Sequence, residues 1–183
     1  MESDKKEIKN QLTIKEVEKL RVDAIYGKKK HYNAADRKSR YHYWLGVVQI
    51  ILNVLLGSYL FGAASMTMPN ALNWAGAVLA LISATAAALQ TYYNFDRQVE
   101  QHRAIATRYL AIAKECSRII AYYKDGALSA SVLREQFEAL SKECDRINAD
   151  SEKCPPGDQD YRKAQLGFKS GEEEYTMAER TAR

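Results

Sequence analysis

The hydrophobic pattern divides the chain into one long uncharged stretch and two charged regions that flank it. Residues 45–95 contain no lysine, arginine, aspartate or glutamate, so all 27 basic and 23 acidic residues lie outside them. A helix on the surface of a water-soluble bundle carries polar and charged residues on its outer face along its whole length. The uncharged stretch therefore indicates helices that are surrounded by lipid.

The uncharged stretch divides into two apolar segments joined by a short turn. The first segment runs from Tyr43 to Gly62 and the second from Leu72 to Thr91, and the link contains the helix breakers Pro69 and Asn70. About 20 apolar residues at a rise of about 1.5 Å cross a hydrocarbon core of about 30 Å. The sequence therefore predicts a hairpin of two antiparallel membrane-spanning helices.

Basic residues predict how the hairpin is oriented. Positive charge gathers on the cytoplasmic side of a membrane span, and here it precedes the first span while the turn has none: Lys28, Lys29, Lys30, Arg37, Lys38 and Arg40. We expect both termini in the cytoplasm, with these juxtamembrane cations facing anionic lipid. A nucleotide or phosphate site at the same cations is the alternative. The first 43 residues show no signal-peptide pattern, so the hairpin itself would direct insertion.

The flanking regions predict long cytoplasmic helices. Thr13 and Glu16 have the spacing of a capping box, which predicts a helix start at Thr13. No proline interrupts the chain after the second span, so we expect one helix from Trp74 to Lys124, ended by Gly126. Small, apolar and aromatic residues at heptad spacing along this helix predict an oligomer seam: Val99, His102, Ala106, Tyr109, Ala113 and Ile120.

A return helix and a tail complete the predicted organisation. Apolar residues on one face predict an amphipathic helix over about 131–148, and the charged segment after the prolines predicts a flexible tail. The fold class is an all-α membrane protein, a two-transmembrane helical hairpin with long cytoplasmic helical extensions. Its regions are an N-terminal basic helix (1–42), the hairpin (43–94), a stalk with its return helix (95–150) and the tail (151–183).

Composition and motifs give no sign of an enzyme. The three histidines match no metalloprotease pattern, and the chain has no glycine-rich phosphate loop and no nucleophile motif. Three cysteines without CxxC spacing favour free thiols in a reducing compartment. A net charge of +4 without an aromatic–basic motif does not favour nucleic-acid binding. We expect no metal and no cofactor, and we expect His102 to be a packing residue.

Polar and small residues within the spans are the candidate site. In the first span Gln49, Asn53 and Gly57 share one face, and in the second span four residues do the same: Gly76, Ala80, Ser83 and Ala87. Such stripes let membrane helices approach closely and hydrogen-bond to each other. The alternative is that, in an oligomer, Gln49 and Asn53 line a water-filled path.

Two segments carry a resemblance to a known family. Residues 26–37 (YGKKKHYNAADR) and residues 100–112 (EQHRAIATRYLAI), together with the hairpin between them, resemble the SLATT family of two-transmembrane effector domains. That resemblance implies a membrane effector of a bacterial anti-phage conflict system, which oligomerises and permeabilises or depolarises the membrane when a nucleotide-linked alarm is raised. It implies abortive infection, with a nucleotidyltransferase system as partner. A non-pore membrane scaffold that recruits a cytoplasmic partner through its helical stalk is the alternative.

Overall fold

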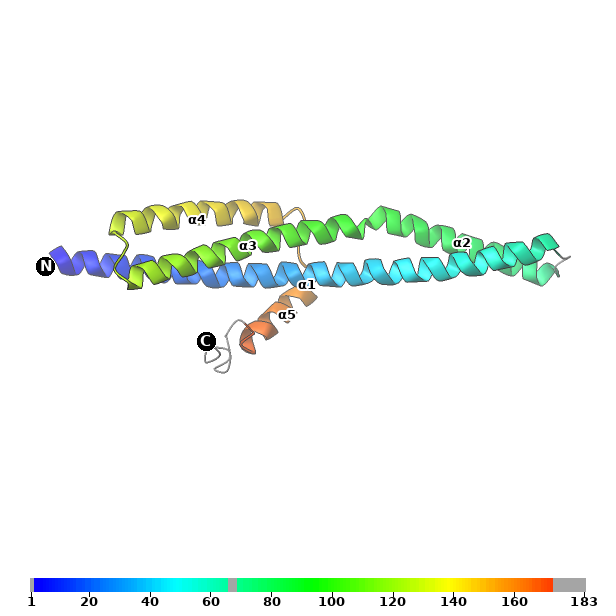
Figure 1. Ribbon diagram of the computed structural model, residues 1–183, viewed down its shortest axis with the longest axis horizontal. Coiled ribbons are helices and arrows are strands. Elements are labelled where there is room, and N and C mark those ends of the chain that lie inside the picture. Colours follow the sequence, from blue (N-terminus) through cyan, green and yellow to red (C-terminus); the bar gives the residue numbers. More distant parts are fainter. Residues whose placement is uncertain (1, 66–68, 173–183) are drawn as a thin grey trace. The chain divides into compact units, whose positions relative to one another are not determined.

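The computed structural model describes residues 2–65 and 69–172, and Figure 1 labels the five helices that these residues form. They are α1 (Glu2–Ser65), α2 (Asn70–Tyr93), α3 (Phe95–Lys124), α4 (Ala130–Ser151) and α5 (Asp158–Lys169). The described residues include no strand, which confirms the prediction of an all-helical protein.

Local residue chemistry explains three of the helix ends. Pro69 precedes α2, and its carbonyl accepts hydrogen bonds from the amides of Leu72 and Asn73. Gly126 follows α3 with a φ of 69°, a left-handed conformation that glycine adopts without steric cost. Ser129 caps α4, because its hydroxyl accepts a hydrogen bond from the Val132 amide. The predicted stop at Gly126 is therefore confirmed, and Pro69 lies between α1 and α2 as expected. Asn70, which we expected to break the helix, is instead the first residue of α2, and residues 66–68 of the predicted turn lie outside the described part.

Three expectations about helix extent differ from the structure. The capping box at Thr13 is wrong, because α1 begins at Glu2 and Thr13 lies within the helix. The single helix from Trp74 to Lys124 is also wrong, since Asn94 separates α2 from α3 with a φ of 41° and a ψ of 58°. Asparagine enters this left-handed region more easily than most residues do. Helix α5 also occupies residues that we expected to be flexible, while residues 173–183 lie outside the described part.

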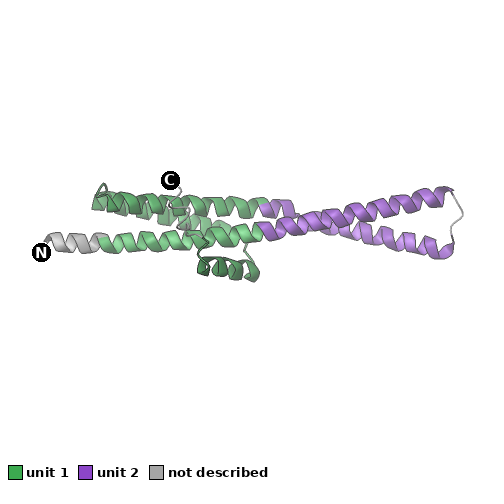
Figure 2. Ribbon diagram, turned by 60° about the horizontal axis from the view of Figure 1, so that its bottom comes forward, with its two compact units in different colours: residues 1–35, 100–183 green, residues 36–99 purple. Residues whose placement is uncertain are grey.

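The chain forms two compact units, which Figure 2 shows in green and purple. The first unit comprises residues 1–35 and 100–183, and the second comprises residues 36–99. The core of the first unit joins α1, α3 and α4: Ile14, Val17, Ala24, Ile25, Ile105, Tyr109, Ile112, Ala113, Cys116, Ile119, Leu133, Cys144 and Ile147. Buried residues at spacings of three and four on each helix identify the faces that pack together.

Helix α5 packs against the α1 segment of the first unit. Asp160 fixes the start of α5, because its carboxylate accepts a hydrogen bond from the Gly157 amide at 2.9 Å. Its own carbonyl accepts a bond from the Asn33 side-chain amide at 3.2 Å. The Lys30 ammonium lies 5.0 Å from the centre of the Tyr161 ring, within the range of a cation–π contact. These contacts give α5 an ordered place, which its charged composition did not predict.

Candidate functional site

A polar cluster joins α1 and α2 within the second unit. The Gln49 side-chain amide donates to the Ser83 hydroxyl at 3.0 Å, and that hydroxyl donates to Asn53 Oδ1 at 2.8 Å. Gln49 also donates to Asn53 Oδ1 at 3.3 Å. Ser83 is only 4% exposed, so its hydroxyl sits at the centre of the contact. Among the described residues, the Gln49 side-chain carbonyl oxygen is buried and has no hydrogen-bond partner.

Only some of the predicted small residues take part in the contact between α1 and α2. Gly76 is buried against the Tyr59 ring, where a Cβ atom would overlap ring carbons. The Tyr59 hydroxyl in turn donates to Asn73 Oδ1 at 3.0 Å. Gly57 has no described atom within 4 Å of where its Cβ would stand. Ala80 is partly buried and Ala87 is exposed.

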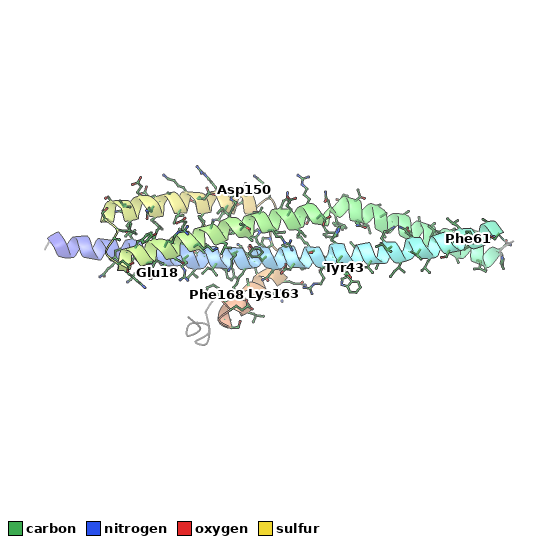
Figure 3. All side chains as sticks on the ribbon, in the orientation of Figure 1. Glu18, Tyr43, Phe61, Asp150, Lys163 and Phe168 are labelled. Atoms are coloured by element: carbon green, nitrogen blue, oxygen red, sulfur yellow. The ribbon has the colours of Figure 1, made fainter. Side chains whose placement is uncertain are left out.

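The two apolar helices bury little of their surface within the second unit. Two helical stretches, Gln11–Ser65 and Asn70–Lys124, are long and apolar enough to cross a membrane, and their most apolar 18-residue windows are 0% and 11% buried. Phe61 is 80% exposed and Trp74 is 74% exposed, and Figure 3 shows the Phe61 and Tyr43 side chains standing out from α1. Soluble monomers rarely expose contiguous apolar patches larger than about a few hundred Å². The second unit therefore fits a membrane protein.

Most of the residues predicted as an oligomer seam are buried inside the first unit. His102 and Ala106 are fully buried, and Tyr109 and Ala113 are 2% and 5% exposed. The Tyr109 ring packs on Gly27 of α1, and its hydroxyl donates to Asn148 of α4 at 2.5 Å. Ile120 is only partly buried and packs against the same core. This heptad face therefore packs within the chain. Such packing produces the same residue spacing as a contact between copies.

The predicted basic residues divide into different environments. In the first unit, Lys29 is 8% exposed and forms an ion pair of 2.7 Å with Glu172, and Lys28 is partly buried. In the second unit, Arg37 lies over the Tyr41 ring, Lys38 donates to the side-chain carbonyl of Gln98, and Arg40 is exposed. Lys30 thus contacts α5 and Lys29 contacts the residues that follow it, and Arg40 is the most solvent-accessible of the six.

A buried histidine pair lies at the centre of the first unit. Nδ1 of His31 on α1 is 3.0 Å from Nδ1 of His102 on α3, and both side chains are 0% exposed. The second nitrogen of His31 lies 2.9 Å from the Ser151 hydroxyl. Burial, followed by the repulsion of His102 and Lys30, lowers the pKa of His31 to about 3. His31 is therefore neutral at physiological pH, and one of its two ring nitrogens accepts a hydrogen bond while the other donates.

An ionic network and a cavity complete the first unit. The Arg108 guanidinium donates to Asp150 at 2.6 Å and to Glu143 at 3.0 Å, which ties α3 to the end of α4. A cavity of about 350 Å³ opens between α1, α3 and α4, and residues of both charges line it: Leu20, Asp23, Tyr26, Gly27, Lys30, Tyr109, Ser141, Cys144, Asp145 and Asn148. Its carboxylates make it a poor container for a polyphosphate, because like charges repel.

Comparison with known proteins gives one family. Residues 14–180 match the model of a family described as "SMODS and SLOG-associating 2TM effector domain family 4". No curated protein and no solved structure matches the chain.

Proposed function

The chain belongs to family 4 of the SMODS- and SLOG-associating two-transmembrane effector domains, and we propose that it is a membrane effector of a bacterial anti-phage conflict system. In this proposal the chain oligomerises and permeabilises or depolarises the inner membrane when a nucleotide-linked alarm is raised. It acts on the membrane and catalyses no reaction. The observation that carries the proposal is a pair of helices with exposed apolar surfaces and polar side chains directed at each other.

Membrane insertion follows from the exposed surface of the second unit. Large apolar side chains are exposed on its α1 and α2 segments. Transfer of each such side chain out of water is favourable by about 1.5–3 kcal/mol. The charged first unit then belongs in the cytoplasm, and the basic residues before the first span favour the same orientation. Both termini are cytoplasmic in this arrangement.

Oligomerisation follows from the polar cluster. In hydrocarbon, an unsatisfied polar group costs several kcal/mol, so a buried acceptor favours any arrangement that brings it a donor. The Gln49 carbonyl oxygen is such an acceptor. A second copy or a line of water molecules would supply the donor once α1 and α2 shift enough to uncover this buried oxygen. Two helices cannot enclose a channel, so permeation requires several copies, with Gln49, Asn53 and Ser83 lining or sealing the path.

The trigger would act through the first unit or through a separate protein. The family description names SMODS and SLOG as associates, and we propose a nucleotidyltransferase system as the source of the alarm. The cavity between α1, α3 and α4 is the place where the chain itself would bind a small signal. Its mixed charges favour a ligand with few phosphates over one with many.

The test is membrane potential in cells that express the chain together with its native gene neighbours during a phage challenge. We expect depolarisation with the wild-type chain. Asn53→Leu removes a polar group from the cluster, and we expect it to change the extent of depolarisation. Thr85→Val is the matched control, because the Thr85 hydroxyl donates only to Leu81 of its own helix. An unchanged potential, with the protein in the membrane and the alarm active, would favour the scaffold alternative. In that case the first unit should capture a partner without depolarisation.

A further inference from the structure

Three metal-ligating side chains from three separate parts of the first unit converge. His31 comes from α1, His102 from α3, and Cys154 from the loop between α4 and α5. One nitrogen from each histidine and the Cys154 sulfur all lie within 4.8 Å of one another. We propose that these three side chains bind a single thiophilic divalent transition-metal ion, and that Zn²⁺ suits their ligand types best.

The distances suit a tetrahedral ion after a small adjustment. Zn–N bonds of about 2.0–2.1 Å and a Zn–S bond of about 2.3 Å place tetrahedral ligand atoms about 3.3–3.6 Å apart. The two histidine Nδ1 atoms are already 3.0 Å apart, so they need only open slightly. The longest separation among the three atoms has to close by about 1 Å, which rotation of a side chain to another rotamer can provide. Cys154 lies in a loop and is only partly buried, so it is the ligand best able to move.

The neighbours of the histidines have the properties of an outer shell around a metal. A metal-bound histidine usually donates its other N–H to a nearby oxygen, which fixes the ring orientation. The Ser151 hydroxyl stands 2.9 Å from His31 Nε2 and can accept that bond. When His31 coordinates through Nδ1, its proton resides on Nε2 and points at Ser151. The Ser151 hydroxyl is therefore compatible with the tautomer that a metal requires, because it can accept this bond.

The Cys154 thiolate supplies the negative charge that the ion needs. The Cys154 thiol gives its proton to solvent and binds as a thiolate, so Zn²⁺ with one thiolate carries one net positive charge. Asp160 is 2% exposed and lies close enough to favour positive charge at His31, whereas Lys30 opposes it. The thiolate is therefore the main group that offsets the charge of the ion. A water molecule would take the fourth position, because three protein ligands leave a tetrahedral ion one place open.

The bound ion would link α1 and α3 to the loop that leads into α5. Structural metal sites contribute folding free energy directly, because the unfolded chain has no preformed site. Metal binding would then hold α4, the loop and α5 against the histidine pair. This inference concerns the first unit and stands whether or not the second unit forms a pore.

Metal analysis of the full-length, tag-free protein in detergent tests the site. We expect about one zinc per chain after purification and, once the zinc is removed, Co²⁺ binding with a thiolate charge-transfer band in the near ultraviolet. Cys154→Ala should abolish that band. Cys144→Ala is the matched control, since Cys144 lies in the core of the same unit and outside the triad, and it should keep the band. Ser151→Ala should weaken Co²⁺ binding by about 10- to 100-fold.

Folding of each variant is checked by far-ultraviolet circular dichroism, and Cys154→Ala is the informative variant because its side chain lies in a loop. Zn²⁺ should raise the midpoint of thermal unfolding in the wild type and in Cys144→Ala, because a ligand that binds the folded state stabilises it. It should not do so in Cys154→Ala. Absence of stoichiometric Co²⁺ or Zn²⁺ binding in the wild type would overturn the proposal. So would a charge-transfer band that survives in Cys154→Ala.

Discussion

Replacement of Gly27 by alanine should destabilise the first unit, although alanine is the better helix former. A Cβ atom at Gly27 would stand 2.9 Å from three carbon atoms of the Tyr109 ring. The ring cannot easily move away, because Tyr109 is 2% exposed and its hydroxyl is hydrogen-bonded to Asn148 at 2.5 Å. The added methyl group therefore has to displace part of the core.

Two opposing terms set the size of the effect. Overpacking of a core costs about 1–3 kcal/mol, and exchange of glycine for alanine inside a helix gains about 1 kcal/mol. The net expectation is a loss of about 1 kcal/mol, which lowers the midpoint of thermal unfolding by about 2–4 °C for a chain of this length. A lower unfolding midpoint would show that overpacking outweighs the gain in helix propensity, and a higher midpoint would show the reverse.

Thermal unfolding of the full-length protein in detergent, followed by circular dichroism, measures this change. The control is Gly27→Ala in a Tyr109→Ala background, where the ring is absent. There the methyl group meets no obstacle, and the substitution should raise the midpoint. A rise in both backgrounds would refute the tight contact between Gly27 and Tyr109, and with it the packing of α3 on α1.

Three further results are expected. The Lys153 and Arg108 hydrogen bonds lower the pKa of Asp150 to about 2. A carboxyl group with a lowered pKa stabilises the fold at pH values above its unfolded pKa of about 4, and that stabilisation is lost as the pH falls towards 2. The loss of stability in acid should therefore be less steep in Asp150→Asn. Asn94→Gly should leave stability nearly unchanged, whereas Asn94→Val should lower the unfolding midpoint, because the φ of 41° disfavours a β-branched residue. If copies associate through the face of α1 that carries Gly46, Asn53 and Gly57, Gly57→Cys should form disulfides between copies in membranes, and Leu55→Cys on the opposite face should not.

Hydrophobic periodicity predicted the helical class and the two apolar helices because it reports how each helix meets its surroundings. Periodicity does not show whether a helix face packs within the chain or against another copy. The heptad face of α3 has the spacing of a contact between copies, yet His102 and Tyr109 pack on α1 and α4 of the same chain. Intramolecular and intermolecular helix contacts obey the same geometry. Only the tertiary arrangement separates the two cases.

The histidine pair was missed because His31 follows three lysines and was grouped with them. A different signal was present, since Ala24, Gly27, His31 and Ala34 recur at spacings of three and four and mark one buried face of α1. Such a face identifies His31 as a core residue. It cannot identify the partner, because His102 lies 71 positions further along the chain. Similarly, the position of α5 depends on contacts with Asn33 and Lys30 that its own composition does not show.

The helix faces that are buried within the chain leave few places where copies could meet. The buried face of α3 is occupied within the first unit, and lipid supplies little hydrophobic drive for contacts between apolar helices. Close approach and hydrogen bonding are the remaining forces. Gly46, Asn53 and Gly57 lie seven and four residues apart on one face of α1, and neither glycine has a described atom within 4 Å of its Cβ position. A neighbouring helix can therefore approach this face closely.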